Sequence, residues 1–229
     1  ATVPFALDAE EGVVGISGYE GEGFWDRLRT DAMNTMLDQE YANLFDRSYI
    51  EIVDTSIDTG RAFKAALDGA PVLATAFSAN DISTAFRMIA RTVSVREALG
   101  MSRQTFMVMF GGWDHHDEVL DAQADMLPVV SRAMGEFYAA LQELGVERLV
   151  TTFTASDFAR TLTSNGRGSD HAGGGPQLVM GGAVDGGRFY GDYPALYSDN
   201  PLDTGRGRLI PTVSTDEYFA ELALWFGVG

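Results

Sequence analysis

The chain has 229 residues, of which 45% are hydrophobic, and this composition predicts a globular protein of one large or two small domains. It contains no cysteine, which excludes disulfides, thiolate metal sites and a cysteine nucleophile. Its formal net charge of −17 argues against nucleic acid or anionic lipid as a partner, and no apolar run reaches the roughly 18 residues of a membrane span.

We expect residues 1–100 to form a mostly helical segment. Apolar side chains recur every three or four positions from about residue 24 to residue 67, and the run Gly69-Ala70-Pro71 ends this pattern. A second helix is predicted over residues 80–99, with Asn80 or Asp81 as its N-cap. Gly100 is typical of the residue that terminates such a helix.

Residues 101–229 are predicted to form an α/β domain. The continuous apolar run 105–110 has the length of a strand that is covered on both faces. A helix is expected over residues 122–144, and a second buried strand over residues 148–154. Strand, helix and strand in this order indicate a βαβ crossover, which makes the two strands parallel. The predicted fold class is therefore α/β, with a mainly parallel sheet flanked by helices.

Two further elements are expected near the carboxyl end. The runs 177–180 and 188–190 flank Asp185-Gly186, which predicts a β-hairpin. Ser214 and Glu217 have the spacing of a capping box and predict the start of a last helix, which Gly227 ends.

All three histidines lie beside aspartates, in two short loops. The first loop contains Asp114-His115-His116-Asp117, and the second contains Asp170-His171 in a glycine-rich stretch. Imidazole and carboxylate together suit Zn, Mn or Fe, and they also suit proton transfer. Because both loops follow predicted parallel strands, we expect them to meet at one edge of the sheet, where ligands bind in open α/β folds.

Residue spacing suggests which side chains act together. Asp114 and His116 are two positions apart and can ligate one ion, whereas alternation turns His115 and Asp117 elsewhere if the backbone is extended. The alternative is that this run is a solvated turn, and that the second histidine loop is only a flexible hairpin entry.

Several charged residues follow the second predicted strand. Asp157 is a candidate third carboxylate, and Arg160 can hold an anionic group bidentately. The alternative is an Asp–Arg ion pair that caps a short helix. Arg167, Arg206 and Arg208 either surround an anion site or pair with surface acids. The sequence contains no P-loop, no dinucleotide fingerprint and no G-x-S-x-G elbow.

Five motifs follow one another along the chain. They are Gly111-Gly112-Trp113-Asp114-His115-His116, Phe153-Thr154-Ala155-Ser156-Asp157-Phe158-Ala159-Arg160-Thr161, Asn165-Gly166-Arg167-Gly168-Ser169-Asp170-His171, Met180-Gly181-Gly182-Ala183-Val184 and Gly207-Arg208-Leu209-Ile210-Pro211-Thr212. In this order they resemble the family labelled domain of unknown function 1501. The resemblance is specific from about Phe106 to Val228. That family is grouped with the alkaline phosphatase and sulfatase superfamily and is usually exported by the twin-arginine route.

The resemblance implies a fold, a location and a cofactor. It implies an alkaline-phosphatase-like fold and a periplasmic or extracellular protein. It also implies a divalent metal, Zn, Mn or Ca. The implied metal ligands are Asp114, His116, Asp170 and His171.

The reaction class that the resemblance implies is metal-dependent hydrolysis of phosphate or sulfate esters. Asp157 would be a ligand or base, and Arg160 would hold the anionic small-molecule or polymer substrate. The alternative function is a non-catalytic structural or accessory subunit within a larger assembly. It is motivated by the family's early Gly-Gly-Asn-Asp type motif, which this sequence lacks.

Overall fold

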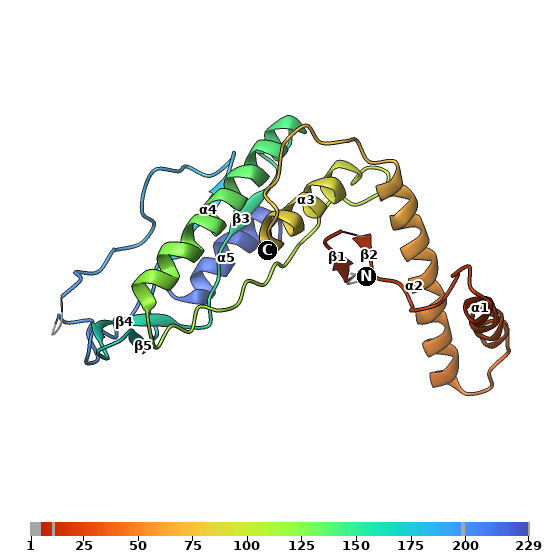
Figure 1. The fold of residues 1–229 in the computed structure, drawn as a ribbon, viewed down its shortest axis with the longest axis horizontal. Coiled ribbons are helices and arrows are strands. Elements are labelled where there is room, and N and C mark those ends of the chain that lie inside the picture. The colour runs from red at the N-terminus through yellow and green to blue at the C-terminus, as the bar shows by residue number, and fades with distance from the viewer. Residues whose placement is uncertain (1–5, 11, 198–199, 229) are drawn as a thin grey trace. The chain divides into compact units, whose positions relative to one another are not determined.

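The computed structural model describes residues 6–10, 12–197 and 200–228. The chain forms two compact units, one of residues 1–73 and 84–104 and the other of residues 74–83 and 105–229. Figure 1 labels the helices and strands of both units. No helix of the described residues combines the length and the apolar character that crossing a membrane requires.

The first unit is mainly helical. Its elements are β1 (Leu7–Asp8), β2 (Gly12–Val13), α1 (Phe24–Leu37), α2 (Leu44–Asp68) and most of α3 (Asp81–Ser94). β1 and β2 form a two-residue antiparallel pair, and β2 contacts α2. The two helices that were expected in this part of the chain are present, but the first of them is broken into α1 and α2.

The break between α1 and α2 has a local cause at Asn43. The Asn43 side chain accepts a hydrogen bond from the Phe45 backbone N–H at 2.8 Å, so it caps a new helix. Periodicity continues across this break, because the apolar spacing on both sides is helical. The hydrophobic pattern therefore predicted one long helix where a capping side chain starts a second one.

The core of the first unit lies at the carboxyl-terminal end of α2. Phe63, Leu67, Met88 and Val95 form one cluster of buried side chains. By contrast, α1 has no buried residue, and several apolar side chains of α1 and the first half of α2 face solvent. They are Phe24, Trp25, Leu28, Met36, Leu44, Phe45, Tyr49 and Ile52.

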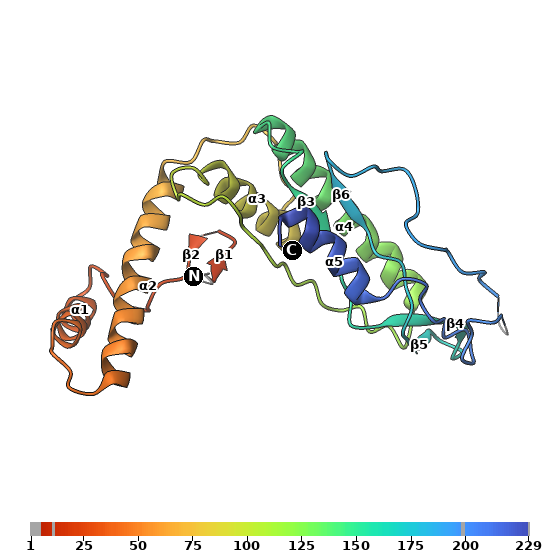
Figure 2. The same cartoon turned by 180° about the vertical axis from the view of Figure 1, so that it is seen from behind.

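The second unit contains the helices α4 and α5 and two small sheets. Its elements are α4 (Val119–Glu143), β3 (Thr151–Phe153), β4 (Ala159–Ser164), β5 (Ser169–Ala172), β6 (Val179–Gly181) and α5 (Thr215–Phe226). β3 pairs with β6 and β4 pairs with β5, both antiparallel. Figure 2 shows β3 and β6 side by side, with α5 near them. Phe153 of β3 contacts the rings of Tyr218 and Phe219 on α5.

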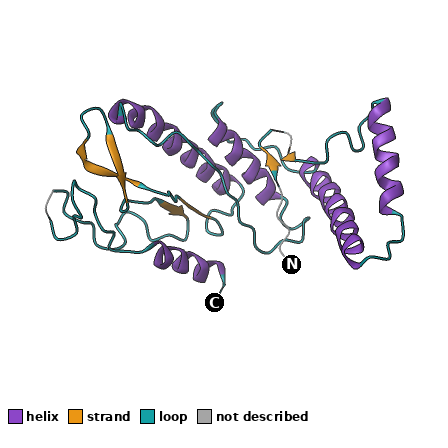
Figure 3. Cartoon of the chain, turned by 90° about the horizontal axis from the view of Figure 1, so that it is seen from below, coloured by secondary structure: helices purple, strands orange, loops and turns teal. Residues whose placement is uncertain are grey.

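The predicted α/β fold with a mainly parallel sheet is wrong. Every strand pair among the described residues is antiparallel, and each sheet has two strands, so the arrangement is not alkaline-phosphatase-like. Figure 3 shows how little of the chain is strand. The expected βαβ crossover fails because β3 pairs with β6 and not with the segment before α4.

The apolar run 105–110 is not a strand. No backbone–backbone hydrogen bond joins it to another described residue, and the Met107 and Met109 side chains are 82% and 83% exposed. A run of this composition fits a strand covered on both faces, but it becomes one only if a second strand lies beside it. The sequence pattern contains no information on whether that neighbour exists.

The carboxyl-terminal hairpin prediction is wrong, while the last helix is confirmed. β6 pairs with β3, and residues 188–190 form no strand. In α5 the Ser214 hydroxyl accepts the Glu217 backbone N–H, and the Glu217 carboxylate accepts the Ser214 backbone N–H, which completes the capping box. Gly227 ends the helix at φ +83°.

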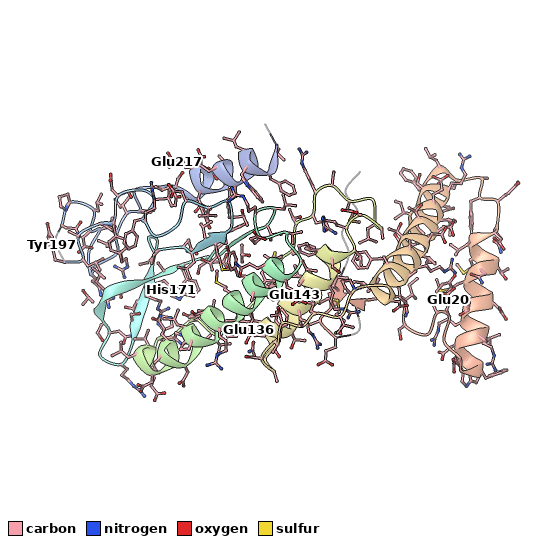
Figure 4. The ribbon with its side chains drawn as sticks, turned by 90° about the horizontal axis from the view of Figure 1, so that it is seen from above. Glu20, Glu136, Glu143, His171, Tyr197 and Glu217 are labelled. Carbon is pink, nitrogen blue, oxygen red and sulfur yellow. The ribbon has the colours of Figure 1, made fainter. Side chains whose placement is uncertain are left out.

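Two glutamates of α4 hold the segment 74–83 against that helix (Figure 4). Glu143 accepts the backbone N–H groups of Ala74 and Thr75 at 2.6 and 2.8 Å, and the Thr75 hydroxyl at 2.6 Å. About two helical turns earlier in α4, the Glu136 carboxylate accepts a hydrogen bond from the Ser83 hydroxyl at 2.7 Å. The hydrogen bonds from Thr75 and Ala74 lower the pKa of Glu143 below its usual 4.5.

We expect Glu143→Gln to lower the urea midpoint of unfolding at pH 7, because an amide group cannot accept all three donors. Since the folded-state pKa of Glu143 is lowered, its contribution to stability is present above pH 4.5 and is lost as the pH falls through the folded-state pKa. The difference in urea midpoint between Glu143→Gln and wild type therefore becomes smaller below pH 4.5. Glu221→Gln, at an exposed position of α5, is the matched control. Equal urea midpoints of Glu143→Gln and wild type at pH 7 would show that these hydrogen bonds do not stabilise the fold.

Candidate metal centre

A tight turn builds the β4–β5 hairpin. The Asn165 side-chain oxygen accepts hydrogen bonds from the backbone N–H groups of Arg167 and Gly168 at 3.0 and 2.8 Å. Gly166, which directly follows Asn165, adopts φ +103°. The strand register places Arg160 of β4 opposite His171 of β5. The hairpin therefore presents an arginine and a histidine side by side.

The first histidine loop docks on this hairpin through backbone groups. The Glu118 N–H donates to the Arg167 carbonyl at 2.8 Å, and the Asn165 side-chain N–H donates to the His116 carbonyl at 2.9 Å. Figures 1 and 2 both show the hairpin beside the first turn of α4, which begins directly after this loop. The two loops thus meet through an antiparallel hairpin and not through parallel strand ends.

Gly168 makes this approach possible. A Cβ atom at this position would lie 2.4 Å from the His116 carbonyl oxygen and 2.8 Å from that of His115. Both distances are far inside van der Waals contact, and the neighbours are backbone atoms that cannot turn away. Only glycine therefore lets the hairpin and the histidine loop lie this close together.

Three side chains converge where the two loops meet. The Asp114 Oδ1 lies 2.6 Å from Nε2 of His171 and 3.1 Å from Nε2 of His116, and one ligand atom from each residue lies within 4.8 Å of the others. Ligands of one tetrahedral ion at about 2.0–2.1 Å are separated by about 3.3 Å. The spacing of Asp114, His116 and His171 thus makes them a candidate group that could hold one metal ion, and all three residues are exposed to solvent.

Arg160 ties the aspartate of this group to both loops. Its Nη1 donates to Asp114 at 3.0 Å, its Nε to the Ser169 hydroxyl at 2.9 Å, and its Nη2 to the carbonyls of His115 and Ser169. The Arg160 side chain is only 13% exposed, so the guanidinium is engaged by the protein itself. The hydrogen bond from His171, and then that from Arg160, lower the pKa of Asp114.

The other two predicted site residues lie in different surroundings. Asp170 is outside the converging group. Its carboxylate accepts hydrogen bonds from Asn165 at 3.3 Å and from Arg206 at 2.6 Å, and these two contacts lower its pKa. Asp157 is exposed, and no described residue forms an ion pair or hydrogen bond with its side chain. The predicted roles of Asp157 and Arg160 in catalysis stay predictions.

Three features of the site were not found from the sequence. The Phe158 ring stacks on His171 with 4.2 Å between ring centroids and an interplanar angle of 11°. Asn165 and Gly168 build the contact between the loops. The Asn-Gly pair is a recognisable turn signal, and the glycine-rich stretch permits close backbone approach, but the sequence does not show that Gly168 is where the loops meet or that Phe158 stacks on His171. Arg206, which was weighed between an anion site and a surface ion pair, pairs with Asp170.

The sequence also matches a protein-family model. The match to the model described as "Protein of unknown function (DUF1501)" covers residues 25–204. The chain belongs to the DUF1501 family. Within it, the match includes Asp114, His116 and His171 and the arginine that holds Asp114. No curated protein and no solved structure matches the chain.

We expect Gly168→Ala to weaken Zn²⁺ binding by about tenfold or more, because the added Cβ separates the hairpin from the His116 backbone. Gly173→Ala is the matched control, since a Cβ at Gly173 meets no atom within 4 Å. Affinity is measured by competition with a chromogenic zinc chelator. If the two variants bind Zn²⁺ equally well, the approach at Gly168 does not control the site.

Proposed function

We propose that Asp114, His116 and His171 bind one divalent transition-metal ion, and that the protein uses it to hydrolyse a phosphate or sulfate ester. The observation that carries this proposal is the convergence of the three ligand atoms within 4.8 Å of one another. Two imidazoles and one carboxylate leave coordination positions open, as in catalytic sites, whereas structural zinc sites are closed by four protein ligands. The solvent exposure of the three side chains supports access by a substrate.

The donor set favours Zn²⁺ or Mn²⁺ over Ca²⁺. Two of the three donors are imidazole nitrogens, and nitrogen ligands suit Zn and related transition metals. Ca²⁺ takes six to eight oxygen ligands, of which this group offers one carboxylate. We therefore retain Zn and Mn from the expected metals and drop Ca.

A bound metal ion would polarise the ester oxygen and lower the pKa of a bound water. The chain's own residues would prepare the site for it. His116 and His171 would each supply a ring nitrogen to the metal. Hydrogen bonds from His171 and then Arg160 lower the pKa of Asp114 in the metal-free protein, which favours its carboxylate form. Arg160 fixes the Asp114 carboxylate, and the Phe158 ring covers one face of His171. These contacts support a preorganised metal site.

The first test is metal affinity. We expect His116→Ala and His171→Ala each to weaken Zn²⁺ binding by about 100-fold or more, because each removes one of three protein ligands. His115→Ala is the matched control: it removes the third histidine, from the same loop, without touching the converging group. Isothermal titration calorimetry with ZnCl₂ on the metal-free protein measures the affinities. An equal loss in His115→Ala, or no Zn²⁺ or Mn²⁺ binding by wild type, would contradict the proposed site.

The second test is turnover. We expect the Zn²⁺- or Mn²⁺-loaded protein to hydrolyse p-nitrophenyl phosphate or p-nitrophenyl sulfate, and Asp114→Asn to reduce kcat/KM by about 100-fold, because it removes the ligand charge. Release of p-nitrophenolate is followed spectrophotometrically. A metal-loaded wild type that releases no product from either ester would exclude hydrolysis of these esters while leaving the metal site intact.

A non-catalytic accessory subunit is the second candidate. The observation that favours it is the row of exposed apolar side chains on α1 and α2, including Trp25 at 71% and Phe45 at 82% exposure. Such side chains on a protein of otherwise high charge are typical of an interaction surface. Co-purification of the native protein in a stable larger assembly, together with absence of ester turnover, would favour this function. Fractionation of the source cells tests the periplasmic or extracellular location that we retain as part of the proposal.

A further inference from the structure

His116 lies between two carboxylates. Its Nε2 is 3.1 Å from Asp114, inside the converging group, and its Nδ1 is 3.5 Å from Oδ1 of Asp170. His171 differs, because its Nε2 faces Asp114 at 2.6 Å while its ring is stacked on Phe158. The two histidines of one site are therefore held by different interactions.

The chemistry of imidazole suggests a role for the carboxylate of Asp170. A neutral imidazole has one N–H and one lone-pair nitrogen, and a metal binds the nitrogen that carries no proton. If Nε2 of His116 is the ligand, its proton resides on Nδ1, which faces Asp170. A carboxylate in that position stabilises this tautomer, orients the ring and makes the ligand nitrogen more basic.

Asp170 is itself fixed from three directions. Its backbone N–H donates to the Thr161 hydroxyl at 3.1 Å, and its carboxylate accepts from Asn165 at 3.3 Å and from Arg206 at 2.6 Å. The Asp170 side chain is 26% exposed, about half as much as those of Asp114 and His116. Such a carboxylate is held in place before any ligand arrives.

The contact from Arg206 depends on an unusual backbone conformation. Arg206 adopts φ +64°, which is uncommon for a residue with a side chain. Several hydrogen bonds hold its segment there. The Thr163 N–H donates to the Arg206 carbonyl at 3.2 Å, and the Asp203 carboxylate accepts the N–H groups of Gly205 and Gly207. Strain of this kind persists where the surrounding contacts enforce it, and it is often found at functional sites.

We propose that Asp170 is a positioning residue of the metal site and not one of its ligands: it holds His116 in the tautomer that presents Nε2, and Arg206 holds Asp170. This inference rests on the proposed metal site, and it replaces the ligand role that the sequence resemblance implied for Asp170. It assigns to residues 203–208, which lie far from the histidine loops in the sequence, a part in setting metal affinity.

Asp170→Asn separates this role from charge alone. One carboxylate oxygen of Asp170 faces His116 Nδ1 and accepts from Asn165, and the other oxygen pairs with Arg206. Asparagine has a single acceptor oxygen, so it cannot serve both. The control is Asp185→Asn, which removes the same charge from an aspartate that pairs with Arg188 at 2.7 Å and whose side chain is 69% exposed.

The experiment combines zinc affinity with NMR of ¹⁵N-histidine-labelled protein, whose three imidazoles give a simple spectrum. We expect Asp170→Asn to weaken Zn²⁺ binding by about 10- to 100-fold and to shift the Nδ1 resonance of His116 but not that of His171. Asp185→Asn leaves affinity and both resonances unchanged. Arg206→Gly, which removes the guanidinium at a position where glycine is unstrained, shifts the same His116 resonance and provides a second variant should Asp170→Asn not fold.

Three results would overturn the inference. Wild-type Zn²⁺ affinity in Asp170→Asn, or equal shifts of His116 and His171, would exclude a positioning role while leaving the metal site standing. A changed coordination number in the absorption spectrum of Co²⁺-substituted Asp170→Asn would make Asp170 a ligand. Failure of wild type to bind Zn²⁺ or Mn²⁺ would remove the proposed function and this inference together.

Discussion

The close backbone approach of two loops at Gly168 is the constraint on which the candidate site depends. The turn of the β4–β5 hairpin lies directly against the carbonyl groups of His115 and His116, where no Cβ fits. Main-chain hydrogen bonds hold the loops together, so the position of the histidines is set by backbone and not by flexible side chains. The geometry of the metal group is therefore a property of one hairpin and the loop before α4.

Local charge balance is the second condition for the site in a chain of net charge −17. Three aspartates lie within four sequence positions of the histidines, and each pairs with an arginine: Asp114 with Arg160, Asp117 with Arg167 and Asp170 with Arg206. These pairs differ in burial, since the Arg160 side chain is 13% exposed and that of Arg167 is 76% exposed. The exposed Asp117–Arg167 pair is expected to contribute little to the geometry of the site, because ion pairs in solvent contribute little.

The sequence was informative where structure is local. Periodicity and caps predicted the helices, and the Ser214–Glu217 capping box is present as expected, because these signals depend on residues a few positions apart. Strand pairing depends on distant segments, and there the prediction was wrong. The run 105–110 pairs with no described strand, and β3 pairs with β6. The histidine loops do meet, but the argument from parallel strands was wrong. The sequence also does not reveal that Nδ1 of His116 faces Asp170, because this contact joins two separate loops and depends on the orientation of the imidazole ring.

The unpaired run 105–110 has a consequence for how the chain behaves over time. Its amide groups have no acceptor on the described backbone, so their protons will exchange with solvent far faster than those of α4, which follows a few residues later. The first histidine loop therefore lies between a segment with fast amide exchange and a helix with slow amide exchange. Thr105–Phe110 also combines strand-forming side chains with free main-chain donors, the combination that promotes self-association when protein is concentrated.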